Sequence, residues 1–185
     1  YTSITASPFS WFEATYRYAE IKNQKYGPAR YSGNQSLKDK GFDIKMLLFS
    51  ERKYMPATAI GIRDIAGTAL FSSEYLVFTK QLGDFDLTAG LGWGVLGSAA
   101  NISNPLESLH GSFKDRNFDV GQGGTFSPKA WFSGNTALLG GIEYDLRKRG
   151  LKFKLEYDTT RPDLDSRKIP IDVDSRFNFG LNYKF

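Results

Sequence analysis

The last ten residues of the chain alternate strictly between apolar and polar side chains. One face of an extended strand would carry Phe177, Phe179, Leu181, Tyr183 and Phe185, and the other Arg176, Asn178, Gly180, Asn182 and Lys184. Successive side chains of a strand point to opposite faces, so the pattern predicts a strand with one apolar and one polar face. Because the apolar face is aromatic rather than rich in Val and Ile, we expect it to face lipid and the polar face to line water or a polar lumen.

Seven further segments show the same two-faced pattern. The clearest run from Asp84 to Val95 and from Leu151 to Asp158. The others are Trp11–Ile21, Phe42–Leu48, Ala57–Ile65, Ser73–Gln81 and Thr136–Leu146. With the last segment they predict eight strands, most of them near the ~9–11 residues that a tilted strand needs to cross a bilayer. No segment shows a sustained helical spacing of apolar residues.

The predicted connections alternate between long and short. The long ones are Lys22–Gly41, Asp64–Ser72, Gly97–Pro128 and Thr159–Asp174, and the short ones are Glu51–Met55, Leu82–Asp84 and Arg147–Gly150. An up-and-down transmembrane barrel has this asymmetry, with long extracellular loops and short periplasmic turns. The chain is therefore predicted to be all-β, an antiparallel up-and-down transmembrane β-barrel of about eight strands with both termini on the short-turn side. A soluble β-sandwich is the alternative, but it gives no reason for loops to be sorted by end.

Composition supports strands and argues against several other classes. The 185 residues suit a single β-barrel domain spanning residues 1–185. Aromatic residues make up 15% of the chain and there are 19 Gly, as expected for many short strands joined by tight turns. No run of about 18 apolar residues occurs, so a transmembrane helix is not expected. Cysteine is absent, which excludes thiol chemistry, and a net charge of +4 is too small and evenly mixed to predict nucleic-acid binding.

Charged residues fall on the polar faces of the predicted strands. Asp84 with Asp86, and Glu143 with Asp145, are two positions apart, so both carboxylates of a pair lie on one face. Each pair could be an acid/base or cation site. We favour charges inside the barrel that pair with cations, because an unpaired charge in a side-chain-filled interior is costly. The candidates for this inner charge network are Glu13, Arg17, Lys45, Arg63, Asp84, Asp86, Glu143, Asp145, Lys152, Lys154 and Glu156.

The chain offers little for catalysis. His110 is the only histidine and lies in the longest predicted loop, beside serines that do not define a nucleophile and base. We therefore expect a solvated loop histidine, no enzymatic activity, and neither a cofactor nor a metal. A lipid-modifying enzyme is a further hypothesis, and it would require His110 to take part in catalysis.

Two polar segments are candidates for contacts. The predicted loop Lys22–Gly41 is basic and could meet anionic lipopolysaccharide or an acidic glycan. Its candidate glycan contacts are Lys22, Lys25, Arg30, Lys38 and Lys40. Next to Arg63, the polar residues Asp64, Ser72, Ser73 and Glu74 crowd where the third predicted strand turns into the fourth. For these we favour a role as hydrogen-bonded loop anchors over a functional site.

Several motifs carry a family resemblance. Arg63-Asp-Ile65 is followed by Phe71-Ser-Ser-Glu-Tyr-Leu-Val77 and then by the segment Gly83–Gly94. Later pieces are Gly124-Thr-Phe126, Trp131-Phe-Ser-Gly134, Gly141-Ile-Glu-Tyr144, Leu151–Asp158 and Phe179-Gly-Leu-Asn-Tyr183. With these motifs, most of the chain after about Phe42 resembles the YjbH-like family of outer-membrane proteins.

The resemblance implies a barrel in the outer membrane of a Gram-negative bacterium and a role in making or exporting extracellular polysaccharide. It supplies no catalytic residues. Family members are much longer than this chain, so the resemblance also implies a part of a longer, multi-barrel protein.

These observations lead to one functional hypothesis and one alternative. The first is an outer-membrane barrel that assists exopolysaccharide secretion or assembly, with extracellular loops in contact with glycan. The alternative is a structural or adhesive barrel with a plugged lumen and no transport role. The expected partners are outer-membrane lipid and lipopolysaccharide, exopolysaccharide, and other proteins of a secretion operon.

Overall fold

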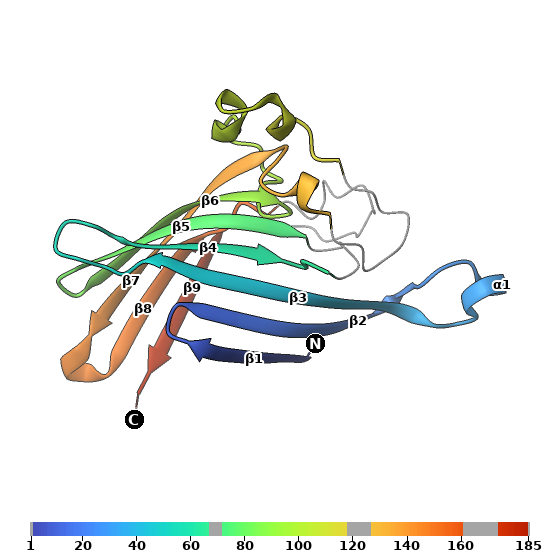
Figure 1. Ribbon diagram of the computed structural model, residues 1–185. Helices are drawn as coiled ribbons and strands as arrows, with labels where there is room; N and C mark the ends of the chain where they lie inside the picture. Colours follow the sequence, from blue (N-terminus) through green and yellow to red (C-terminus); the bar gives the residue numbers. More distant parts are fainter. Residues whose placement is uncertain (1, 67–71, 118–126, 161–173, 185) are drawn as a thin grey trace.

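The computed structural model describes residues 2–66, 72–117, 127–160 and 174–184. They form one antiparallel sheet in which nine strands follow each other in chain order (Figure 1). The strands are β1 (Thr2–Phe9), β2 (Phe12–Lys25), β3 (Ser36–Phe49), β4 (Ala57–Arg63), β5 (Ser73–Leu82), β6 (Phe85–Gly94), β7 (Thr136–Leu146), β8 (Leu151–Tyr157) and β9 (Phe177–Tyr183). The prediction of an all-β, antiparallel chain with neighbouring strands paired in order is confirmed.

The sheet bends into a trough and stays open in the described residues, where β1 and β9 form no pair with each other (Figure 1). The predicted number of eight strands is wrong, because β1 pairs with β2 along the edge of the sheet. The apolar face of this strand is weak, since it carries only Ile4, Ala6 and Pro8, and four of the eight residues are Ser or Thr. Its pairing rests on main-chain hydrogen bonds and a contact between the hydroxyls of Thr5 and Thr15 at 2.8 Å. Apolar alternation therefore marks this strand only weakly.

The connections alternate as predicted. The short ones join β1 to β2, β3 to β4, β5 to β6 and β7 to β8, and the long ones lie at the opposite end of the sheet. The prediction that both termini lie at the short-turn end is wrong for the N-terminus, because the additional strand β1 begins at the long-connection end (Figure 1). Three of the predicted long loops, Asp64–Ser72, Gly97–Pro128 and Thr159–Asp174, lie partly outside the described residues, as does the motif Gly124-Thr-Phe126.

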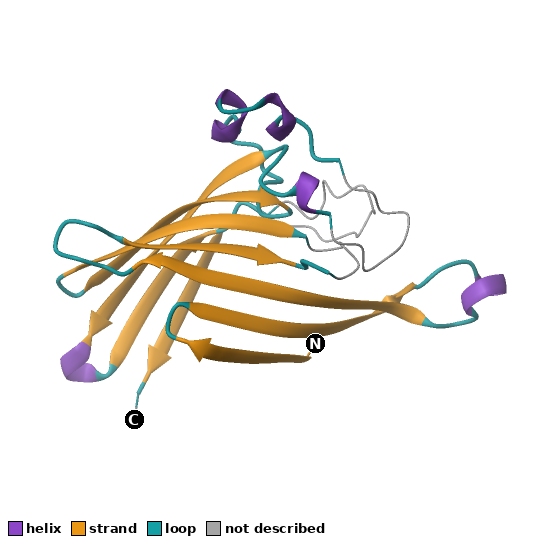
Figure 2. Cartoon of the chain, viewed as in Figure 1, coloured by secondary structure: helices purple, strands orange, loops and turns teal. Residues whose placement is uncertain are grey.

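The predicted loop Lys22–Gly41 is mostly strand, which corrects the sequence interpretation. β2 and β3 continue as a two-stranded ribbon that projects beyond the rest of the sheet and ends in the short helix α1 (Ala29–Ser32) (Figure 2). We call residues 20–38 the ribbon. The ladder ends with a hydrogen bond from Tyr26 N to Gln35 O at 3.0 Å. A ribbon without a packed face needs only its cross-strand hydrogen bonds, so polar residues such as Lys22 and Lys25 can form it without any apolar period.

The remaining helices are single 3-10 turns that belong to the connections: η1 (Pro105–Ser108), η2 (Gly111–Phe113), η3 (Pro128–Ala130) and η4 (Arg147–Arg149). None of the helices in the described part of the chain has the length and apolar character needed to cross a membrane.

The strand register keeps side chains of one kind on one face of the sheet. Leu87, Ile142, Leu155 and Phe179 form one row across β6 to β9 on what we call the outer face. The adjacent row, formed by Thr88, Gly141, Glu156 and Asn178, lies on the opposite, inner face. The two-faced pattern of the sequence is therefore carried through the whole sheet.

Burial is inverted relative to a globular protein. The buried apolar side chains in the described residues are Ala59, Trp93, Ala130 and Ala137. Large apolar side chains of the outer face are exposed, among them Phe42, Leu138, Ile142, Phe153, Phe179 and Leu181. A water-soluble domain of this size would bury such side chains in a core. The described sheet instead buries charged and hydroxyl side chains.

Candidate functional site

A charged cluster lies on the inner face where β2, β3 and the end of β4 meet. Arg17 and Asp39 are both buried and form an ion pair at 3.5 Å. Arg17 also lies 3.8 Å from Asp43, whose other carboxylate oxygen accepts a hydrogen bond from Asp64 N at 2.9 Å. Gly41 makes this approach possible, because a Cβ there would lie 2.8 Å from both Arg17 and Asp64. Glycine at this position thus leaves room for the Arg17 and Asp64 side chains.

The predicted residue Arg63 borders the same cluster, 4.0 Å from Asp43. Glu13 and Lys45 are direct cross-strand partners on the inner face and line a small cavity with Arg63. The structure therefore brings Glu13, Arg17, Lys45 and Arg63 into one region.

A second charged group lies on β7 and β8. Glu143 Oε1 accepts a hydrogen bond from Lys154 Nζ at 2.6 Å, and its Oε2 lies 3.0 Å from Lys152 Nζ. Asp86 is the cross-strand partner of Glu143, and Asp145 that of Lys152. Two cations thus face the carboxylates that the sequence placed on this face.

Asp84 lies apart from these groups, at the turn that precedes β6. It pairs with Arg147 of the neighbouring short turn at 3.8 Å, and both side chains are exposed. Of the predicted inner charges, Asp84 is thus placed at the short-turn rim of the sheet.

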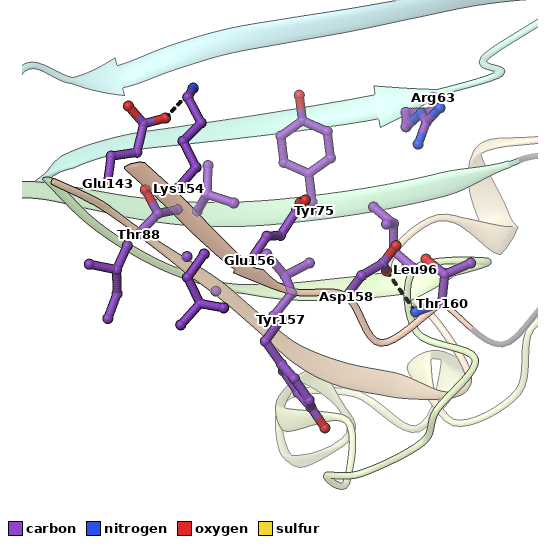
Figure 3. Close-up of a pocket in the computed structure, with 16 residues that line it drawn as sticks. Arg63, Tyr75, Thr88, Leu96, Glu143, Lys154, Glu156, Tyr157, Asp158 and Thr160 are labelled. Carbon is purple, nitrogen blue, oxygen red and sulfur yellow. Dashed lines mark hydrogen bonds and ion pairs between the residues drawn. The ribbon is translucent and has the colours of Figure 1, made fainter. Parts of the chain in front are cut away.

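A groove of about 550 Å³ opens on the inner face between β4–β5 and β7–β8 (Figure 3). Tyr75 points into it, whereas Tyr157 points away to the other side of the sheet (Figure 3). The Glu143–Lys154 pair lies at one end of the groove, and Arg63 and Asp158 at the other (Figure 3). The predicted inner residue Glu156 also lines it. The groove is lined by positively and negatively charged side chains, an aromatic ring and hydroxyl groups.

The predicted anchor residue Glu74 lies on the outer face at the long-connection end of β5. Its carboxylate is fully buried and binds both terminal nitrogens of Arg116, at 2.6 and 2.8 Å. It also accepts a hydrogen bond from Phe132 N at 2.8 Å. Arg116 in turn donates to Ser72 Oγ at 3.1 Å and to Ala130 O at 3.0 Å.

Ser73, the cross-strand partner of Arg63, is buried beside Glu74. Asp64 follows the last residue of β4 and has a positive φ of 60°, so it adopts the left-handed conformation at the start of the β4–β5 connection. Glu74 and Ser72 tie the β6–β7 connection to the sheet, whereas Asp64 contacts the cluster around Arg17.

Asn104 makes a second attachment of the β6–β7 connection. Its Oδ1 accepts from the indole nitrogen of Trp93 and from Leu106 N, each at 3.1 Å. Its Nδ2 donates to Phe113 O and Phe132 O at 2.9 and 3.0 Å. One buried amide therefore satisfies four partners and seals Trp93 from water.

The candidate glycan contacts Lys22, Lys25, Arg30, Lys38 and Lys40 are all exposed and lie on the ribbon or at its base. Tyr26 and Tyr31 are exposed near the tip, and the Arg30 guanidinium lies 4.5 Å from the Tyr31 ring centroid. The structure thus gathers the predicted basic residues on a strand ribbon with aromatic neighbours, rather than on a loop.

His110 is exposed in the β6–β7 connection. Its Nδ1 lies 2.8 Å from Ser112 Oγ and accepts a hydrogen bond from Ser112 N at 3.1 Å. This is the arrangement of a residue that caps a short 3-10 turn, here η2.

Sequence reasoning missed Asp39, Asn104 and Arg116, each of which is central to one of these groups. Asp39 fell in a segment interpreted as loop, and Arg116 in a connection without apolar periodicity. A local signal existed only for Asn104, since Asn before Pro105 is a common start of a helical turn.

Comparison with known proteins gives two matches over the full length of the chain. The model of the YjbH family, described as "Exopolysaccharide biosynthesis protein YbjH", matches residues 1–185. A curated relative from Escherichia coli (strain K12), "Uncharacterized lipoprotein YjbH", is 39% identical over 185 residues. Those residues are 100% of this chain and 26% of the relative, so the chain spans about a quarter of the length of that protein. No solved structure matches. The chain therefore belongs to the YjbH family, whose description is exopolysaccharide biosynthesis.

Proposed function

We propose that this sheet is embedded in the outer membrane of a Gram-negative bacterium and that the protein assists exopolysaccharide secretion or assembly. The observation that carries the proposal is the inverted burial: an exposed apolar outer face opposite an inner face with buried ion pairs. Lipid around the outer face would remove the exposed aromatic and aliphatic side chains from water. The name of the family supports the link to exopolysaccharide.

The side chains on the outer face of β2 and β3 change along the strands from aliphatic to aromatic to cationic, as expected at a membrane boundary. From the short-turn end it runs through Met46 and Ile44 to the ring pair Tyr16–Phe42, whose centroids are 5.2 Å apart, and then to Lys40 and Lys38. Aromatic residues belong at the interface, and cations belong beyond it among anionic headgroups.

The length of the apolar part of β3 agrees with the thickness of an outer-membrane barrel's apolar band. The eight residue steps from Lys40 to Leu48 of β3 give about 27 Å along the strand, or about 21 Å across the membrane at a tilt of about 40°. An outer-membrane barrel has an apolar band about 25 Å high. Insertion in hydrocarbon also requires that the main-chain groups of both sheet edges be paired.

The ribbon supplies the glycan contact in this proposal. Its exposed cations would attract the phosphates of lipopolysaccharide or the carboxylates of an acidic polysaccharide, and Tyr31 would add a ring surface. The ribbon lies at the end of the long connections, which the proposal assigns to the outside of the cell.

The buried cluster around Arg17 favours a specific form of the alternative function. Side chains that fill the inner face of β2 to β4 would obstruct a lumen, as in a structural or adhesive barrel without transport. Conductance in planar bilayers separates the two: stable ion conductance of the full-length protein supports a path through it, and its absence favours the plugged form.

The first experiment is refolding of the full-length protein in detergent micelles, followed by electrophoresis with and without boiling and by far-UV circular dichroism. A β spectrum with a mobility shift on boiling is expected for a membrane barrel. A stable β spectrum in plain buffer without a mobility shift would overturn the membrane proposal. Deletion of the gene in its host, with complementation, then tests the second half, for which we expect reduced secreted polysaccharide.

A further inference from the structure

We propose that the inner-face groove beside Tyr75 binds uncharged sugar units of a polysaccharide. This inference rests on the proposed function, and it adds a binding site and the class of sugar. The groove holds about 550 Å³, enough for a few sugar rings, and none of the residues that line it belongs to the ribbon.

The groove exists because its floor lacks side chains. Gly141 of β7 faces Thr88 of β6 and Glu156 of β8 across the sheet. A Cβ added at Gly141 would meet only main-chain atoms, the nearest being Leu155 O at 3.3 Å. Among the described residues, no side chain lies within 4 Å of that Cβ, so the floor is open to a ligand.

Tyr75 forms a fixed wall of the groove. Its ring lies over Gly61 of β4, where a Cβ would be only 2.2 Å from the Tyr75 Cζ atom. A side chain at position 61 would push the ring away, so glycine sets the orientation that Figure 3 shows. A half-buried tyrosine presents an electron-rich ring face and a hydroxyl, and the C–H groups of a sugar ring pack on such a face.

Two carboxylates give the groove its preference for uncharged sugars. Glu156 is exposed and forms no hydrogen bond or ion pair with any other residue that the structure describes. Asp158 is the next inner-face residue along the chain and accepts a hydrogen bond from Thr160 N at 2.8 Å. A carboxylate can accept hydrogen bonds from two neighbouring hydroxyls of a sugar, whereas it repels the carboxylate of a uronic acid.

Each of the two cations that line the groove has a carboxylate neighbour. Lys154 is bonded to Glu143, and Arg63 faces Asp43. The carboxylate of Glu156 is therefore the polar group best placed to meet a ligand. This separates the groove from the ribbon, whose exposed cations suit anionic ligands.

The test uses full-length protein in detergent micelles and titration calorimetry with hexasaccharides of glucose and of galactose, and with polygalacturonate as the acidic probe. We expect saturable binding of at least one neutral hexasaccharide. Gly141→Leu, which fills the floor, and Tyr75→Ala should each weaken it by about tenfold or more, whereas Tyr75→Phe retains the ring and should bind within a few-fold of wild type. Glu156→Gln keeps one acceptor oxygen and should weaken neutral binding while relieving the repulsion of polygalacturonate from the groove.

Tyr54→Ala in the β3–β4 turn is the matched control, because it removes an exposed tyrosine that does not line the groove and lies outside the ribbon. It should leave the binding of both the neutral hexasaccharides and polygalacturonate unchanged. Each variant is first checked for the mobility shift on boiling, so that misfolded protein is excluded.

Two results would overturn the groove proposal: no saturable binding of either neutral hexasaccharide, or a Gly141→Leu variant that shifts on boiling and binds them as tightly as wild type. In either case, a wild-type protein that shifts on boiling and binds polygalacturonate leaves the proposed function standing. If the wild-type protein shows no mobility shift on boiling, the proposed function itself is wrong.

Discussion

Glu74 and Arg116, which lie 42 positions apart, form a double hydrogen bond between a fully buried carboxylate and a guanidinium, at 2.6 and 2.8 Å. The pair fixes the β6–β7 connection to the outer face of β5 at the long-connection end. Geometry of this kind is strong because two parallel bonds fix both distance and orientation. It attaches the described parts of that connection around Arg116 and Ala130 to the sheet.

Glu74→Gln is expected to loosen this attachment. The substitution keeps the shape but leaves the Arg116 charge without a buried partner, which costs about 3 kcal/mol for pairs of this kind. Hydrogen exchange should increase from Ser98 to Arg116, and proteases should cut the connection faster. Glu107→Gln, on the exposed surface of η1, is the control and should change neither. Equal protection in the wild type and in Glu74→Gln would contradict a structural role for the pair.

Asn104→Ala should open the site of Trp93. The substitution leaves the indole nitrogen and the amide of Leu106 without their acceptor, at about 1–3 kcal/mol for each buried group. In a background where Trp11 and Trp131 are replaced by Phe, the emission of Trp93 should move to longer wavelength as water enters. An unchanged spectrum would show that another group seals the ring.

Gly61→Ala should displace Tyr75. A methyl group at position 61 would lie 2.2 Å from the ring, and overpacking of this kind costs about 1–3 kcal/mol. The double variant Gly61→Ala/Tyr75→Ala should lose less stability than the sum of the two single variants, because the clash disappears with the ring. Urea or thermal unfolding in micelles measures all three. Strict additivity would show that the ring and Gly61 do not interact.

Phe179→Lys and Asn178→Lys test which face meets lipid. The two positions are adjacent on β9 but point to opposite faces, and Phe179 is 83% exposed. In a bilayer, lysine on the outer face near the middle of a strand should cost about 2–4 kcal/mol, and lysine at position 178 much less. Folding equilibria in lipid vesicles give both values. If Phe179→Lys proves neutral in vesicles, the outer face does not contact hydrocarbon.

The β3–β4 turn should respond to acid through Glu51. The hydrogen bond from Lys80 Nζ, at 2.7 Å, lowers the pKa of this carboxyl, and the amide of Gln81 lowers it further, while partial burial acts in the opposite direction. Because the folded pKa lies below the unfolded one, the contribution to stability is complete at neutral pH. It is lost as the pH falls through the folded pKa, below the usual range for Glu.

The titration of the Glu51 side-chain carbon by NMR measures this shift directly. A midpoint at the ordinary value for an exposed Glu would contradict the contact with Lys80. Glu51→Gln should remove this part of the acid sensitivity.

Eight of the nine strands were predicted because each of them carries apolar side chains on one face and polar side chains on the other. β1 and the ribbon were missed for one physical reason. Apolar alternation is clear only in strands that carry large apolar side chains on one face. β1 offers only Ile4, Ala6 and Pro8 there, and the ribbon strands are mostly polar.

The charged residues of the candidate site could be predicted only where they alternate with apolar residues along a strand. Glu143, Lys152 and Lys154 share a face because of their spacing, and their ion pairs followed from it. Asp39 and Arg116 act through tertiary contacts with partners distant in sequence, and no local pattern marks such contacts. The groove could not be predicted either, because it depends on the missing side chain at Gly141 and on the space over Gly61 that the Tyr75 ring occupies.

The sheet formed by the described residues has an odd number of strands, which constrains how its two edges can be joined. In an antiparallel sheet, alternate strands run in the same direction, so the first and ninth strands point the same way. Bringing β1 directly beside β9 would create a single parallel seam, with slanted and somewhat weaker main-chain hydrogen bonds. One intervening strand would restore antiparallel pairing on both sides. Cysteine pairs placed along the two edges would distinguish these arrangements, because a parallel seam and an inserted strand bring different residues within the reach of a disulfide.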